Sequence, residues 1–410
     1  MRILFVAPHP FSSGEAMTAL HSAGQAERRG AAVRFFAAPQ NARLFAGQFP
    51  PARVTDMTAD GSTNRRRLAA LVAEFRPRAI VFCDYAILPE WAGAMPLASE
   101  PWIDQLDGID AELFTFDHMG LEQPGCGARP ARRPRQPDRM RVLLPCPMHE
   151  PSSPPARRGV PFRYWMPRRV ADAEREAARR PFVPPSGGHL VFHAVSSWAW
   201  KIARGKGALY YDVLPAILES YLADLPHPVT IVSVNNGSLL PAAPRGKVRI
   251  VNRPPLAVGE YERLLAASDL VLTENCFSST LGKAVCIGVP AVAWQNRFDA
   301  KALHGEAGDD APLALVDLLR RSPAAIEPWL VFPLLSFDWE PHLRVLDGNS
   351  IGRAFLRLEI FGGRATSEAL RGVLLESPVR RRMQEDARRY AHDMRRLPEF
   401  CDALTEAARA

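Results

Sequence analysis

Short apolar runs alternate with amphipathic segments along the first half of this chain. Runs with the length and composition of buried strands lie at 2–7, 32–37, 79–83 and 142–144. Segments 14–29 and 64–75 carry apolar residues at helical spacing, and Gly30 follows the first as a helix-ending residue. Strands that alternate with helices predict a doubly wound parallel sheet of the α/β class.

The second half repeats this pattern after a change of composition. Residues 174–188 pass from charged to proline- and glycine-rich, which is typical of a linker. Strand-like runs follow at 190–195, 229–234, 248–251, 270–273 and 291–294. Helical segments are expected at 207–225 and 260–267, and an Arg-rich helical region at 368–409. We therefore predict domains at 1–175 and 189–375, a linker at 176–188, and C-terminal helices at 376–410.

The composition agrees with a two-domain globular protein. A chain of 410 residues with 47% hydrophobic residues is long enough for two cores. No apolar run approaches the roughly 20 residues that a membrane span needs. The opening MRILFVAPHP breaks at a proline after a few apolar residues, so it is interpreted as a first strand and not as a signal sequence.

The cysteines indicate the redox environment. The chain has 6 cysteines, which form no C-x-x-C pair, and several lie inside strand-like runs. This pattern favours reduced core thiols over a disulfide framework or a zinc site. We therefore expect a cytoplasmic protein without a bound metal.

The positive charge is concentrated in one region. Between Arg129 and Arg169 eleven arginines face two acids, so this region carries more positive charge than the formal +7 of the whole chain. The run RPARRPRQPDRMR has prolines that prevent a helix and no interleaved aromatics, which argues against a nucleic-acid interface. Two interpretations of Arg129–Arg141 stay open: a solvated loop, or a docking surface for an acidic partner or an anionic membrane.

One stretch, SDLVLTENCFSSTLGKAVCIGVP at 268–290, has the pattern of a ligand site. A strand at 270–273 and a polar break lead into a helix at 280–287, which Gly288 ends. A helix N-terminus presents unpaired N–H groups and a positive dipole end, which together can hold a diphosphate. The alternative is an ordinary βαβ turn in which the serines are N-caps. The residues placed to contact a diphosphate are Ser278, Ser279 and Thr280.

This stretch resembles the donor-binding segment of GT-B glycosyltransferases, which have two facing Rossmann-like domains. It is most similar to the family 1 sugar transferases and to the lipid II N-acetylglucosaminyltransferase. The shared spacing is kept by Ser279, Thr280, Gly288 and Pro290. Three features depart from the pattern. Glu274 stands where family 1 enzymes have a histidine, Asn275 and Cys276 replace glycines, and Lys283 replaces the acidic residue that usually binds the nucleotide ribose.

The resemblance implies an arrangement of substrates. The first domain would bind a small-molecule or carrier-bound acceptor, the second a nucleotide-diphosphate sugar, and the C-terminal helices would cross back to the first domain. The turn at Ser196 and Ser197 takes the place of a second phosphate-contacting loop, and Asn296 and Asp299 take the place of donor-sugar contacts. Related enzymes transfer the sugar by direct displacement with inversion, and they need neither a metal nor a cofactor.

The resemblance also indicates a catalytic base. In family 1 enzymes a histidine after the first strand deprotonates the acceptor, and an aspartate at the end of a later strand supports it. Here Glu15 takes the place of the histidine and Asp84 that of the aspartate, so the usual Asp–His dyad is absent. We predict Glu15 as the base with Asp84 supporting it. His9 on the same loop is the competing base, and Glu15 could instead be a helix-start acid favoured by the dipole.

The leading functional hypothesis is therefore a nucleotide-sugar-dependent glycosyltransferase. An alternative within the same fold is a sugar-nucleotide epimerase or hydrolase. An alternative of another class is a catalytically silent GT-B protein that serves as an auxiliary or binding subunit, and the three departures favour it. Lys283 cannot accept hydrogen bonds from ribose hydroxyls, so another acceptor would have to do so, and Glu274 could pair with Lys283.

Overall fold

A computed structural model describes most of the chain and divides it into two compact units. It describes residues 1–9, 14–85, 108–118, 120, 139–152, 159–168, 170–234, 246–298, 313–322, 327–332, 343–344 and 346–409. Unit 1 contains residues 1–166, 341–345 and 393–410, and unit 2 contains residues 167–340 and 346–392. The predicted linker, 176–188, begins inside a helix of unit 2.

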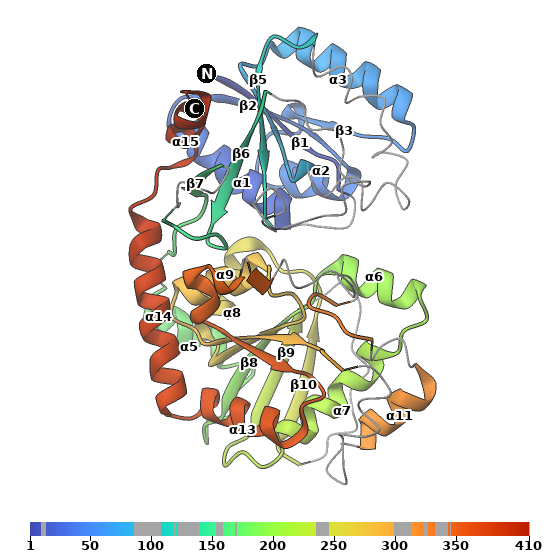
Figure 1. Ribbon diagram of the computed structural model, residues 1–410, viewed down its shortest axis with the longest axis vertical. Helices are drawn as coiled ribbons and strands as arrows, with labels where there is room; N and C mark the ends of the chain where they lie inside the picture. The colour runs from blue at the N-terminus through green and yellow to red at the C-terminus, as the bar shows by residue number, and fades with distance from the viewer. Residues whose placement is uncertain are drawn as a thin grey trace. The chain divides into compact units, whose positions relative to one another are not determined.

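Unit 1 is built on a 7-stranded sheet in the order β3-β2-β1-β4-β5-β6-β7, in which all strand pairs are parallel (Figure 1). Its strands are β1 Arg2–Ala7, β2 Ala32–Ala37, β3 Val54–Asp56, β4 Ala79–Phe82, β5 Glu112–Phe116, β6 Met140–Cys146 and β7 Val160–Arg163. Its helices are α1 Gly14–Arg28, α2 Pro39–Ala46, η1 Pro51–Arg53, α3 Gly61–Phe75 and α15 Phe400–Arg409.

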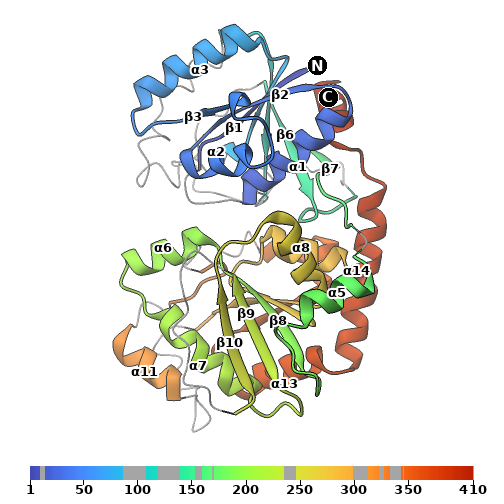
Figure 2. The same cartoon turned by 180° about the vertical axis from the view of Figure 1, so that it is seen from behind.

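Helices cover both faces of this sheet. Because successive side chains of a strand point to opposite faces, Leu4 and Val6 pack on one face with Leu68 of α3. Phe5 points to the other face, where its ring lies 5.5 Å from that of Phe400 in α15. The two helices accordingly lie on opposite sides of the sheet in both views (Figures 1 and 2).

Unit 2 has a 6-stranded sheet in the order β10-β9-β8-β11-β12-β13, again parallel throughout. Its strands are β8 His189–Ala194, β9 Val229–Val234, β10 Val248–Arg253, β11 Leu270–Thr273, β12 Ala291–Gln295 and β13 Leu356–Glu359. Its helices are α5 Asp172–Arg179, α6 Ser197–Gly205, α7 Tyr210–Leu222, α8 Val258–Ala267, α9 Ser279–Cys286, α11 Leu313–Arg321, η7 Ser350–Arg353 and α13 Gly363–Leu374. Helix α14, Pro378–Arg395, leads back to unit 1.

The α/β class, the two parallel sheets and the return of the C-terminal helices are confirmed. One helix was not predicted: α6 begins at Ser197, ahead of the helical segment expected at 207–225. Strands β3, β5, β7 and β13 were not predicted. Strand β13 has no fully buried residue, so it lacks the apolar signal of a buried strand.

Glycine ends two of the predicted helices. Gly30 after α1 and Gly288 after α9 have φ values of 74° and 77°, which a residue with a Cβ rarely adopts. The N–H groups of Gly288 and Val289 bond to the carbonyls of Val285 and Ala284 at 3.0 Å each. These bonds satisfy carbonyls of the last turn, so the chain leaves α9 directly into β12.

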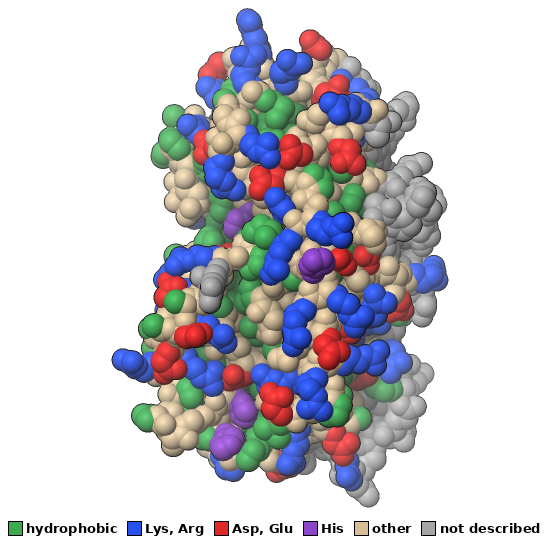
Figure 3. Space-filling view, turned by 90° about the vertical axis from the view of Figure 1, so that its left-hand side faces the viewer, with side chains coloured by type: hydrophobic (Ala, Val, Ile, Leu, Met, Phe, Trp, Pro, Cys, Tyr) green, Lys and Arg blue, Asp and Glu red, His purple; other side chains and the backbone are tan. Residues whose placement is uncertain are grey.

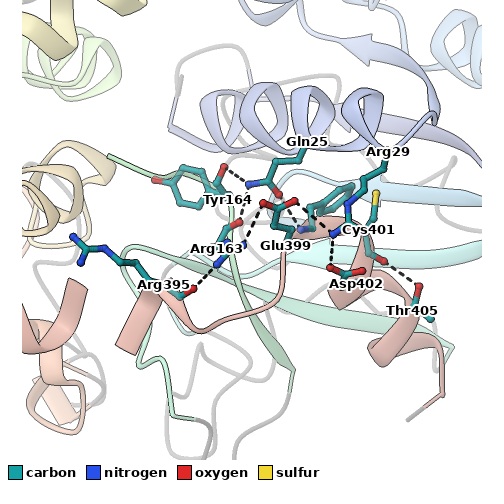
Figure 4. Close-up of polar contacts among 10 residues, drawn as sticks. Gln25, Arg29, Arg163, Tyr164, Arg395, Glu399, Cys401, Asp402 and Thr405 are labelled. Carbon is teal, nitrogen blue, oxygen red and sulfur yellow. Dashed lines mark hydrogen bonds and ion pairs between the residues drawn. The ribbon is translucent and has the colours of Figure 1, made fainter. Parts of the chain in front are cut away.

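A buried glutamine of α1 attaches the C-terminal segment to unit 1 (Figure 4). The Nε2 of Gln25 donates to the carbonyls of Arg163 and Tyr164 at 2.9 and 3.1 Å, and its Oε1 accepts the N–H of Phe400 at 2.9 Å. Arg163 also pairs with Glu399 at 3.2 Å. One side chain thus satisfies backbone groups of two segments that lie far apart in the sequence.

Helix α14 explains much of the Arg-rich character of the C-terminal region. Its exposed face carries Arg381, Arg382, Arg388 and Arg389. Acids lie among them, and Arg389 pairs with Asp386 at 3.0 Å. Figure 3 shows that basic and acidic side chains are interspersed on the side of the molecule that carries α14. This face is therefore mixed in charge.

Two sequence predictions concern the surface and the thiols. Most of the Arg129–Arg141 segment lies outside the described residues; its last residue, Arg141, pairs with Glu112. The described cysteines, Cys83, Cys146, Cys276, Cys286 and Cys401, are free thiols. No helix in the described part of the chain is long and apolar enough to cross a bilayer.

The docking of α15 predicts a stability effect. Phe400 is fully buried among Phe5, Phe116 and Phe162, with ring centroids 5.5 to 6.2 Å away. Phe400→Ala should destabilise unit 1 by about 3–5 kcal/mol, because it removes a large buried ring and leaves a cavity. Urea unfolding measures this. The matched change Val379→Ala on α14, where Val379 is 45% exposed, should stay within about 0.5 kcal/mol. Equal effects of the two changes would contradict the docking of α15.

Candidate functional site

A buried aspartate lies at the carboxyl edge of the sheet in unit 1. Asp84 follows β4, is 0% exposed and has φ 69°, a conformation that is uncommon outside glycine. Its Oδ2 lies 3.1 Å from Nδ1 of His118, which follows the neighbouring strand β5. Because β4 and β5 are parallel neighbours, their carboxyl ends bring these two residues together. Sequence analysis missed His118 because it did not predict β5.

His118 also contacts helix α1. Its Nε2 lies 2.8 Å from Oγ1 of Thr18, and that hydroxyl can donate to the carbonyl of Gly14 at 3.4 Å. Burial alone lowers the pKa of His118, but the hydrogen bond and charge of Asp84, together with the charges of Glu15 and Asp117, raise it above its usual value. A protonated His118 donates from both ring nitrogens, which fits this arrangement of acceptors.

The other predicted acceptor-site residues lie at the same edge. The Nε2 of His9 is 3.2 Å from the carbonyl oxygen of Asp84, and the carbonyl of His9 accepts a bond from Asn41 at 2.7 Å. Glu15 lies in the first turn of α1, partly exposed, and its charge helps raise the pKa of the buried Cys83 thiol after burial itself. The structure therefore brings His9, Glu15 and Asp84 together.

Three polar atoms at this edge have no hydrogen-bond partner among the residues that the structure describes. They are Nδ1 of His9, Oδ1 of Asp84 and Oδ1 of Asn41, and all three are buried. A buried polar atom without a partner costs free energy, so it is stabilised when water or a ligand group reaches it. His9, which follows β1, contacts the carbonyl of Asp84, whereas the carboxylate of Asp84 is paired with His118, which follows β5.

Unit 2 contains a second buried carboxylate–histidine pair. The Oε1 of Glu274, directly after β11, lies 2.8 Å from Nε2 of His193 in β8. The Nδ1 of His193 is 3.2 Å from Oγ of Ser233 in β9. All three side chains are at most 3% exposed. Burial, followed by the charge of Glu274, raises the pKa of Tyr210 and of Tyr211.

This arrangement corrects the expected partner of Lys283. Glu274 binds His193, and Lys283 instead pairs with Glu262 of α8 at 3.1 Å. Burial lowers the pKa of Lys283, while the charge and hydrogen bond of Glu262 oppose that shift. Glu274 and Lys283, two of the three departures from the family pattern, therefore each have a different side-chain partner.

The N-terminus of α9 follows β11 as predicted. Ser278 is the N-cap, and its hydroxyl accepts the N–H of Thr280 at 3.2 Å. The hydroxyl of Thr280 contacts that of Tyr261 in α8. Ser279 begins the helix. Ser278 therefore caps the helix, as expected of an ordinary βαβ turn. The other N–H groups of the first turn remain at the carboxyl edge of the sheet.

A second helix N-terminus lies at the same edge. Ser196 is the N-cap of α6, which begins at Ser197 directly after β8. Strands β8 and β11 are hydrogen-bonded neighbours, so both helices start from adjacent strands. The basic residue Arg204 of α6 pairs with Asp212 at 2.5 Å and lies over the ring of Trp200.

Asn296, one of the two residues predicted to contact the donor sugar, is held by backbone groups of the protein. Asn296 is 0% exposed, and its side-chain amide bonds to the backbone of Phe298 and Glu327. Its backbone exchanges two hydrogen bonds with Trp329, in an isolated antiparallel bridge. A second bridge joins Asn275 to Val331, so segment 327–332 crosses the carboxyl ends of β11 and β12. Asp299 lies outside the described residues.

A family model covers nearly the whole sequence. It matches residues 22–410 and describes a family of unknown function, DUF6365. The chain belongs to DUF6365. No curated protein sequence matches it.

Solved structures similar to this DUF6365 chain include two glycosyltransferases and a protein in complex with UDP-glucose. The spinosyn rhamnosyltransferase SpnG is 15% identical over 99% of each chain, with a TM-score of 0.57. HepE of Anabaena, in complex with UDP-glucose, is 14% identical over 100% of this chain and 98% of its own, with a TM-score of 0.53. The glycosyltransferase VinC, in complex with dTDP, is 14% identical over 100% and 99%, with a TM-score of 0.52. The GT-B fold is thereby confirmed.

The Asp84–His118 pair predicts a pH dependence of stability. Because the pKa of His118 is raised above 6.5 in the folded state, its contribution is fully present below about pH 6.5 and is lost as the pH rises through that raised value. Urea unfolding at several pH values should show this loss for the wild type and not for His118→Gln. The exposed His392→Gln is the control and should keep the wild-type trend. An unchanged trend in His118→Gln would show that this pair does not carry the effect.

Proposed function

We propose that the protein is a glycosyltransferase that moves a sugar from a nucleotide-diphosphate donor bound by unit 2 to an acceptor bound by unit 1. The observation that carries this proposal is the position of α6 and α9, whose N-termini start from the adjacent strands β8 and β11. Two positive helix ends at one edge are suited to the two charged groups of a diphosphate. The full-length GT-B fold supports the same function.

The proposed chemistry is a single displacement. The acceptor oxygen attacks the anomeric carbon, the bond from that carbon to the diphosphate oxygen breaks, and the acceptor proton passes to a base. This displacement inverts the configuration at the anomeric carbon. The N–H group of Ser279 and the positive dipole end of α9, with the start of α6, stabilise the negative charge that develops on the departing diphosphate.

The proposed acceptor site is the edge that holds His9, Glu15 and Asp84. Glu15 is the proposed base, because it is partly exposed on the first turn of α1 while its charge acts on the cluster around Asp84. Asp84, held by His118, is its supporting residue, and His9 is the competing base. The unpartnered Nδ1 of His9 and Oδ1 of Asp84 can bond to an acceptor hydroxyl.

Donor binding is tested by thermal shift with UDP, GDP, dTDP, CDP and ADP. A diphosphate present at 100 times its Kd should stabilise the protein by about 2.7 kcal/mol. Thr280→Val, which keeps the shape and removes a hydroxyl at the α9 N-terminus, should weaken that shift. Thr405→Val on α15, an exposed threonine of unit 1, should leave it unchanged. If none of the five nucleotides shifts the melting temperature at millimolar concentration, the donor site is wrong.

The base is tested by Glu15→Gln. This change keeps the shape and removes the basicity, so kcat should fall by about 100-fold or more while donor binding is retained. Glu27→Gln near the other end of α1, where Glu27 pairs with Arg53, is the matched control and should keep kcat. Near-normal kcat in Glu15→Gln would transfer the role to His9, for which His9→Gln is the corresponding variant.

A second candidate is a protein that binds a nucleotide and transfers nothing. The observation that favours this candidate is that the side-chain amide of Asn296 already donates to the backbone carbonyls of Phe298 and Glu327. Release of nucleoside diphosphate from a sugar nucleotide separates the two candidates, since a binding protein releases none. Release that needs no acceptor would instead indicate a hydrolase.

A further proposal is that Arg129–Arg141 recruits an anionic acceptor or an anionic membrane. Acceptor or membrane binding that weakens as the salt concentration rises would support it.

A further inference from the structure

An ion pair joins the two helices beside the proposed diphosphate site. The Nζ of Lys283 in α9 lies 3.1 Å from Oε1 of Glu262 in α8. The Lys283 side chain is 6% exposed, whereas that of Glu262 is 21% exposed. A lysine that loses its hydration in this way is retained when a charged partner and hydrogen bonds compensate it. Glu262 supplies the opposite charge and a hydrogen bond, and its own side chain remains partly exposed.

The same part of α8 reaches the first turn of α9. The hydroxyl of Tyr261 contacts that of Thr280, and the next residue, Glu262, pairs with Lys283. Lys283 follows Thr280 by three positions, a rise of about 4.5 Å along a helix. The side chains of Tyr261 and Glu262 therefore contact α9 at two positions less than one turn apart, the first of them in the turn proposed to hold the diphosphate.

We propose that Glu262, held in place by Lys283, accepts the hydrogen bonds of the ribose hydroxyls of a bound nucleoside diphosphate. This inference rests on the proposed function, because it places the diphosphate at the α9 N-terminus. Both hydroxyls of a ribose are donors, and a carboxylate has two acceptor oxygens for them. Lys283 has no acceptor, so it acts as a positioning residue that fixes the orientation of the carboxylate. A ribonucleotide is then preferred over its 2′-deoxy analogue.

The test compares the calorimetric affinities of ribonucleoside diphosphates with those of their 2′-deoxy forms. UDP and dUDP, GDP and dGDP, CDP and dCDP, and ADP and dADP are the probes, with inorganic pyrophosphate as a probe of the phosphate site alone. Glu262→Gln should weaken ribonucleotide binding by about tenfold, as expected for loss of hydrogen bonds to a charged group. It should also reduce the ribose-to-deoxyribose ratio and leave pyrophosphate binding unchanged.

The matched control is Glu260→Gln on the same helix. Glu260 pairs with Arg253 at 2.9 Å and is 47% exposed, so this change should alter neither affinity nor the ratio. A purely structural Glu262 would lower stability in Glu262→Gln and keep the wild-type ratio, and that result would overturn the proposal. If the wild type binds neither the nucleotides nor pyrophosphate, the proposed function and this inference are both overturned.

A second variant tests the role of Lys283. Lys283→Met keeps the apolar stem and removes the ammonium group, so Glu262 loses the contact that orients it. Ribonucleotide affinity should fall in the same direction as in Glu262→Gln, with pyrophosphate binding retained. Wild-type affinity and ratio in Lys283→Met would show that Lys283 does not position the carboxylate.

Discussion

The carboxyl edges of the two sheets depend on one constraint: a carboxylate buried there must have a hydrogen-bonding partner. Asp84 and Glu274 are almost completely buried, and each is paired with a histidine. Removing one partner of a buried pair typically costs about 3–5 kcal/mol, because the remaining charge stays desolvated. Each edge therefore keeps its geometry only while its pair is intact.

These pairs connect strands that are neighbours in the sheet. Asp84 and His118 join the ends of β4 and β5, and Thr18 extends the contact to α1. In unit 2, Ser233, His193 and Glu274 cross three consecutive strands, β9, β8 and β11. Networks of this kind hold loops that the parallel sheet itself does not hydrogen-bond, and candidate binding groups gain a fixed position from them.

The two units present different chemistry at equivalent edges. In the described part of unit 1, buried polar atoms of His9, Asp84 and Asn41 have no hydrogen-bond partner, an arrangement suited to binding a hydroxyl group. Unit 2 offers two helix N-termini from adjacent strands, an arrangement suited to a charged diphosphate. In the proposed sugar transfer, unit 1 would supply the acid–base groups and unit 2 the preorganised positive dipoles.

Local pattern alone determined the α/β class, most of the strands and helix α9. The residues of β1, β8 and β11 are nearly all buried, and such apolar runs are visible without the fold. Gly30 and Gly288 marked helix ends because their backbone conformation is a local property. The position of Ser278 as an N-cap could be predicted for the same reason.

Pairing between distant residues was decided only by the tertiary structure. Sequence analysis placed Lys283 near Glu274, but β8 lies beside β11 and brings His193 to Glu274, while α8 brings Glu262 to Lys283. His118 lies beside Asp84 because β4 and β5 are neighbours in the sheet. Segment 327–332 is joined to Asn296 by backbone hydrogen bonds, which no side-chain pattern encodes. Charge partners depend on which elements become neighbours, and that depends on the packing of the whole sheet, whereas strand and helix signals depend on residues only a few positions apart.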